Sequence, residues 1–128
     1  MKYYFEKKLE NVSFEEAIEK TTEALKEEGF GVLTEIDVSA TMKKKLDVDF
    51  RPYRILGACS PNHAYRALSA EDKIGAMLPC NVIVQKVEDG VEVAAVDPIA
   101  SMSAVQNKEL EPVAKEVREK LQAVIDRL

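Results

Sequence analysis

The segment NVIVQKVEDGVEVAAV, residues 81–96, decides the fold class. Two valine-rich runs flank the dipeptide Asp89-Gly90, which is a strong signal for a two-residue hairpin turn. A turn centred on these two residues predicts antiparallel strands in which Val84 pairs with Ala95. The chain therefore contains an antiparallel sheet, and the remaining segments are best interpreted as additions to this hairpin.

Two longer helices follow from capping signals and apolar periodicity. Ser13 and Glu16 form a capping box ahead of an apolar stripe that ends near Gly29. A second apolar stripe occupies nearly five turns at the end of the chain. Because proline is tolerated only in the first turn, Pro112 places the start of this helix within 107–111.

Shorter elements complete the pattern. A helix after the capping residue Ser39 is predicted to bury Met42 and Leu46 and to expose three lysines. The order β-α-β-α-β-α-α-β-β-α predicts a single two-layer α+β domain, residues 1–128, with a mostly antiparallel sheet of about five strands and helices mainly on one face. The predicted strands are 2–9, 32–38, 53–59, 81–87 and 91–96, and the predicted short helices are 40–46, one starting at Pro61 and one starting after Ser69.

Composition and charge exclude several functional classes. A net charge of −5 argues against general binding to nucleic acid or anionic membranes, and no apolar run is long enough to span a bilayer. The first residues lack the apolar stretch of a signal peptide, and two cysteines are too few for a disulfide framework. We therefore expect a cytoplasmic protein without nucleic-acid or membrane partners.

The charge is unevenly distributed. Residues 43–73 carry seven basic and four acidic side chains, so this segment is positive within an acidic chain. One interpretation is a solvated lysine-rich helix with scattered arginines, and the other is a local surface that favours anions.

Two cysteines and a histidine form the chemically suggestive cluster of the sequence. Cys59 ends a predicted strand just before the helix start Ser60-Pro61, where free backbone N–H groups favour negative charge. Cys80 begins the next strand, so both sulfur atoms should converge at one edge of the sheet. Gly57 would permit close approach by a ligand or by backbone. The candidate ligand-binding residues are Cys59, Asn62, His63, Cys80, Asn81 and Arg54.

Familiar catalytic and cofactor motifs are absent. The sequence has one histidine and contains no G-x-S-x-G elbow, Walker loop or C-x-x-C motif, so we predict no cofactor. Two thiols and one imidazole leave a zinc site one ligand short, so no metal site is predicted. Free cysteines also commonly fill core space at strand ends, and this structural interpretation of both thiols stays open.

The two cysteine segments carry a resemblance to a known family. The strings YRILGACSP, residues 53–61, and IGAMLPCNV, residues 74–82, are similar to the bacterial and archaeal family called domain of unknown function 302. The resemblance covers nearly the whole chain, although His63 stands where that family often has a small or apolar residue. It implies a compact α+β fold that is often a homodimer, and it implies no activity.

Three functional hypotheses follow. The first is a non-enzymatic binding module for a small, anionic ligand near Cys59 and Cys80. The second is a thiol-dependent enzyme or redox protein in which Cys59 is the nucleophile and Cys80 the resolving thiol. The third is a purely structural or interaction homodimer. The residues favour the binding module over an enzyme.

Overall fold

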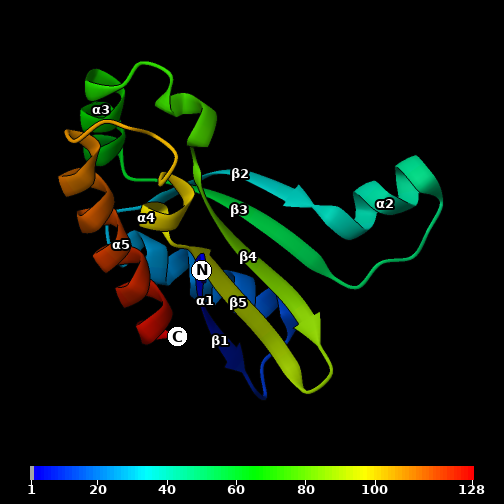
Figure 1. Cartoon of the computed structure of the whole chain (residues 1–128). Helices are drawn as coiled ribbons and strands as arrows, with labels where there is room; N and C mark the ends of the chain where they lie inside the picture. The colour runs from blue at the N-terminus through cyan, green and yellow to red at the C-terminus, as the bar shows by residue number, and fades with distance from the viewer. Residues whose placement is uncertain (1) are drawn as a thin grey trace.

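A computed structural model describes residues 2–128 (Figure 1). The chain folds into a five-stranded sheet with helices of very different length. In chain order the elements are β1 (Tyr4–Leu9), α1 (Phe14–Glu27), β2 (Gly31–Asp37), α2 (Val38–Leu46), β3 (Tyr53–Cys59), α3 (Pro61–Ala70), the 3₁₀ helix η1 (Ile74–Met77), β4 (Cys80–Val87), β5 (Gly90–Val96), α4 (Pro98–Ser101) and α5 (Leu110–Arg127).

The sheet is antiparallel throughout, with strand order β1-β5-β4-β3-β2. Helices α1 and α5 pack together against one of its faces (Figure 1). Alternate residues of the inner strands, such as Val82 and Val93, are fully buried beneath these helices. The predicted two-layer α+β architecture is therefore confirmed.

Both long helices start as the sequence predicts. Ser13 and Glu16 make the reciprocal hydrogen bonds of a capping box at the start of α1. Gly29 follows that helix with a φ of 86°, a backbone conformation that favours glycine. Helix α5 begins at Leu110, so Pro112 lies in its first turn, where no backbone hydrogen bond is lost.

The predicted register of the hairpin is wrong. Val84 pairs with Val93 instead of Ala95, because the loop consists of residues 88–89 and Gly90 already belongs to β5. A Cβ atom at Gly90 would collide with the backbone oxygen of Leu9 on β1. The glycine is therefore required by close packing of two strands and not by the turn itself.

Helix α2 also differs from the prediction. Its side-chain cap is Asp37 and not Ser39, and none of its residues is buried. Leu46, which was expected to be in the core, is 66% exposed. In Figure 1 the helix stands apart from the other helices, beyond the ends of β2 and β3. We call residues 38–52, which comprise α2 and the loop to β3, the α2 arm.

Candidate functional site

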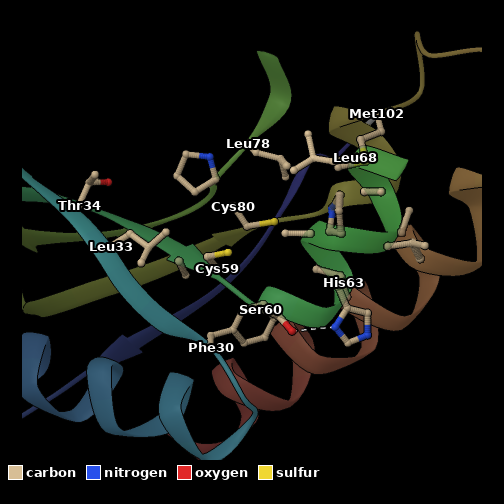
Figure 2. A pocket seen from close by; sticks show the side chains of 18 residues that line it. Phe30, Leu33, Thr34, Cys59, Ser60, His63, Leu68, Leu78, Cys80 and Met102 are labelled. Atoms are coloured by element: carbon tan, nitrogen blue, oxygen red, sulfur yellow. Dashed lines mark hydrogen bonds between the residues drawn. The ribbon is translucent and has the colours of Figure 1, made fainter. Parts of the chain in front are cut away.

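A cavity of about 300 Å³, partly open to solvent, lies where β3 ends and β4 begins, between the sheet and helices α3 and α5 (Figure 2). Only Thr34, Ser60 and His63 contribute side chains with nitrogen or oxygen atoms to its lining. The lining residues are Phe30, Leu33, Thr34, Ala58, Cys59, Ser60, His63, Ala64, Ala67, Leu68, Leu78, Pro79, Cys80, Pro98, Met102, Val113, Ala114 and Val117.

The sheet register brings the two cysteines to this cavity. Cys80 is paired with Ala58 across β3 and β4, and Cys59 is the next residue along β3. Both thiols lie at the cavity in Figure 2, as the sequence predicted. Cys80 is buried, and desolvation raises the pKa of its thiol from 9.0 to about 11. At neutral pH the Cys80 side chain is therefore a protonated, weakly polar wall of the cavity.

Close packing at Gly57 fixes the geometry beside the cysteines. A Cβ atom at this position would overlap the hydroxyl of Thr34 and come within 2.8 Å of the Pro79 ring. The close approach expected at this glycine is therefore made by the protein itself. A bulge in β2 leaves Leu33 unpaired between Val32 and Thr34, so Leu33 is highly exposed at the rim of the cavity.

Ser60 departs from its expected role as a helix cap. It occupies the N-cap position of α3, yet its side chain makes no capping hydrogen bond. Its hydroxyl instead lies 2.7 Å from Nδ1 of His63 (Figure 2). The free amides in the first turn of α3 are consequently left without a side-chain acceptor.

Glu116 on α5 determines which nitrogen of His63 carries the proton. Arg66 donates two hydrogen bonds to Glu116, at 2.8 and 3.0 Å, and thereby lowers the pKa of that carboxyl from 4.5 to about 2. An ionised carboxylate only accepts, so Nε2 of neutral His63, 3.2 Å from Glu116, is the protonated nitrogen. Nδ1 then accepts the hydrogen bond that the Ser60 hydroxyl donates.

The other predicted site residues lie outside the cavity lining. Asn62 is exposed on α3, and Asn81 faces a hollow on the side of the sheet that carries no helices. Arg54 lies near the opposite end of β3, where it makes ion pairs with carboxylates including Glu35 and Asp37. The expected grouping of six residues is therefore reduced to Cys59, Cys80 and His63.

Sequence reasoning missed Glu116. This residue lies 53 positions from His63 in the chain and has no motif around it, so only the packing of α5 against α3 brings the two together. Among residues 2–128, no three or more His, Cys, Asp or Glu side chains are placed to hold a metal ion. Within the same residues, no helix is both long and apolar enough to cross a membrane.

Comparisons with known proteins agree with the resemblance noted from the cysteine segments. The family model described as domain of unknown function DUF302 matches residues 5–128. No match was found among curated proteins. The crystal structure of an uncharacterized conserved protein DUF302 from Bacillus stearothermophilus is similar over 99% of this chain and 98% of its own, with 28% identity and a TM-score of 0.91. The chain therefore belongs to the DUF302 family of domains of unknown function.

Proposed function

We propose that this protein is a binding module for a small, mostly apolar molecule that occupies the cavity beside Cys59 and Cys80. The observation that carries the proposal is the composition of the cavity lining, in which three side chains among eighteen bear nitrogen or oxygen atoms. No lysine or arginine lines the cavity. We therefore propose a neutral ligand in place of the anionic ligand that the sequence led us to expect.

The size of the cavity supports this ligand class. An engineered apolar cavity of about 150 Å³ binds benzene in another protein, and the present cavity has a volume of about 300 Å³. Each Å² of apolar surface that leaves water contributes roughly 25 cal/mol to binding. A small aromatic or branched aliphatic molecule would thus gain affinity from burial, while Ser60 and His63 offer it one polar contact.

The thiol-dependent alternative has weaker support. Burial raises the pKa of Cys80, the proposed resolving thiol, to about 11, so the thiolate that the resolving step requires is strongly disfavoured near neutral pH. The two unpaired cysteines fit a reducing compartment, and we propose that the protein acts in the cytoplasm.

Indole is a suitable probe for this proposal, because the chain contains no tryptophan and indole fluorescence can be followed without protein background. We expect saturable binding of indole and much weaker binding of indole-3-carboxylate, whose charge would have to be desolvated. Ala64→Phe places a bulky side chain in the cavity and should abolish indole binding. Ala123→Phe, a half-buried position on α5 outside the cavity lining, is the matched control.

Two results would contradict the binding proposal. One is the absence of saturable indole binding together with no thermal stabilisation by other small neutral aromatics. The other is equal binding by the wild type and by Ala64→Phe, which would place the probe elsewhere on the surface.

We further propose that the protein forms a homodimer. In it, the α2 arm of each copy lies on the helix-free face of the other copy's sheet, which we call the open face. The arm buries none of its helical residues, and Leu46, Val48 and Phe50 are exposed on it. The open face continues this apolar character, since Ile36, Ile55 and Ile83 are neighbours in register across β2, β3 and β4. Such a surface gains stability when a second copy covers it.

Charge complementarity favours this arrangement. A hollow of about 450 Å³ on the open face is lined by the carboxylates of Glu6 and Glu92 and by no lysine or arginine. The α2 arm presents Lys44 and Lys45, which make no ion pair among residues 2–128. The reciprocal contact is isologous, so one arm and one face from each copy are sufficient to close the dimer.

Sedimentation equilibrium tests the dimer. We expect twice the chain mass for the wild type and the mass of a single chain for the double variant Leu46→Glu/Phe50→Glu. Lys44→Glu/Lys45→Glu should raise the dissociation constant, and Lys115→Glu/Lys120→Glu on α5 is a charge-matched control. A wild type that sediments as a monomer at millimolar concentration would contradict the proposal.

A further inference from the structure

We propose that Ser60, His63 and Glu116 form a catalytic triad that hydrolyses a small apolar ester bound in the cavity. The inference rests on the proposed function, because the cavity must first bind the apolar part of the substrate. It extends that function from binding to acyl transfer, with Ser60 as nucleophile, His63 as general base and Glu116 as the residue that positions His63.

The hydrogen-bond geometry is that of an activated hydroxyl. The Ser60 hydroxyl oxygen is 2.7 Å from Nδ1 of His63, and Nε2 of the same ring is 3.2 Å from Glu116. Because Nε2 carries the proton, Nδ1 presents its lone pair to the hydroxyl proton that has to leave. The relation of nucleophile, base and carboxylate matches a serine–histidine–acid triad in which the two ring nitrogens exchange roles.

The His63 ring is held in the orientation that a general base for Ser60 requires. Its side chain is only 12% exposed, and Arg66 anchors the carboxylate that holds it through a bidentate contact. An imidazolium formed during reaction would lie against the negative charge of Glu116. The Glu116 carboxyl is ionised near neutral pH, and Arg66 lowers its pKa further, to about 2.

The start of α3 supplies donors for the developing oxyanion. In an ordinary N-cap the serine oxygen lies within hydrogen-bonding reach of the amides in the first helical turn. Here that oxygen is turned to His63 and no side chain caps the helix. A carbonyl carbon bonded to the Ser60 oxygen would bring its own oxygen close to the amides of Asn62 and His63.

The reaction balances with ester and water as the only reactants. The Ser60 oxygen bonds to the ester carbonyl carbon, and its proton passes to Nδ1 of His63. The tetrahedral intermediate then collapses, the bond to the leaving alcohol breaks, and the alcohol oxygen takes the proton from Nδ1. Water attacks the acyl-serine by the same route, with His63 again as base, and releases the carboxylic acid and free Ser60.

Hydrolysis of p-nitrophenyl butyrate tests the triad, because its acyl chain is short and apolar. We expect turnover by the wild type and a fall in kcat/KM of about 10²-fold or more for both Ser60→Ala and His63→Ala. Ser69→Ala, an exposed serine at the far end of the same helix, should leave the rate unchanged. Phenylmethylsulfonyl fluoride should sulfonylate Ser60 with loss of fluoride, and peptide mass spectrometry would locate the modified residue.

A spectroscopic readout separates positioning from a merely structural role of Glu116. His63 is the single histidine of the chain, so its ring nitrogens give unambiguous ¹⁵N signals. We expect the wild type to show the Nε2–H tautomer and Glu116→Ala to show a mixture of tautomers with reduced kcat. Arg66→Ala retains the carboxylate beside His63 and should retain the Nε2–H tautomer.

The outcomes distinguish this inference from the binding proposal. Indole binding without ester hydrolysis above the Ser60→Ala level would overturn the triad and leave the binding module intact. Hydrolysis that persists in Ser60→Ala, or sulfonylation confined to other residues, would also overturn it. Failure of both indole binding and hydrolysis would remove the two proposals together.

Discussion

Helices α2 and α3 both follow a strand of the same sheet, but they meet very different surroundings. Helix α3 is held against α5 by the Arg66–Glu116 and His63–Glu116 contacts, and Ala67 is buried at its inner face. Helix α2 has no buried residue and extends beyond the sheet. The comparison indicates that the chain itself buries the inner face of α3 beside the cavity, whereas it leaves the α2 arm uncovered.

The largest expected effect comes from placing a charge on each helix in turn. Ala67→Asp would bury a carboxylate at a position that is 2% exposed, and we expect it to lower the free energy of unfolding by about 3–5 kcal/mol. Ala40→Asp, the matched substitution at an exposed position of α2, should cost less than about 0.5 kcal/mol. Urea denaturation measures both values, and similar losses would show that α2 is anchored as firmly as α3.

A smaller loss is expected where the sheet supports the cavity. Gly57→Ala introduces a Cβ atom into the space of Thr34 and Pro79, so we expect a loss of about 1–3 kcal/mol. The control is Gly31→Ala on β2, whose Cβ atom would meet nothing within 4 Å. Thermal unfolding of the two variants checks the prediction, which fails if Gly57→Ala is as stable as the control.

Burial beside the cavity should also protect the Cys80 thiol from alkylation. At pH 8 a pKa of about 11 in place of 9.0 reduces the thiolate fraction, so iodoacetamide should alkylate Cys80 about 100-fold more slowly in the folded chain than in guanidinium. Mass spectrometry of the labelled peptide gives both rates. Equal rates would mean that this end of the sheet opens readily in the folded chain.

A weaker, pH-dependent effect tests the ionic contact that Glu116 on α5 makes with α3. The pKa of Glu116 is about 2 in the folded chain, whereas its ordinary value, which applies to the unfolded chain, is 4.5. Between pH 2 and pH 4.5 the unfolded chain therefore binds more protons than the folded chain. Stability from this contact is therefore complete above pH 4.5 and is lost as the pH falls toward 2. We expect the difference in melting temperature between the wild type and Glu116→Gln to shrink from pH 6 to pH 3. A difference that stays constant would contradict an ionic contribution.

Local signals in the sequence were sufficient to predict the two layers of the fold. Capping at Ser13 and the long apolar stripe of α5 each depend on neighbours a few residues away, so they can be read without knowing the tertiary structure. The hairpin register could not be read in this way, because Gly90 serves a contact with Leu9, which lies on a distant strand.

The candidate site was predictable only in part for the same reason. The meeting of Cys59 and Cys80 follows from adjacent strands, and the register confirms it. Glu116 comes from a helix remote in sequence, and the diversion of the Ser60 hydroxyl to His63 depends on side-chain geometry. The apolar side chains of the α2 arm suggested burial, but burial requires a neighbour that the single chain does not provide.

The bulge in β2 has a consequence for how copies of this protein can associate. β2 is an edge strand, and such strands invite edge-to-edge pairing that extends a sheet from one molecule to the next. The extra residue Leu33 interrupts the regular ladder of backbone groups along this edge and kinks the strand. Open-ended growth of fibrils through β2 is thereby disfavoured, whereas the proposed face-to-face association would close after two copies.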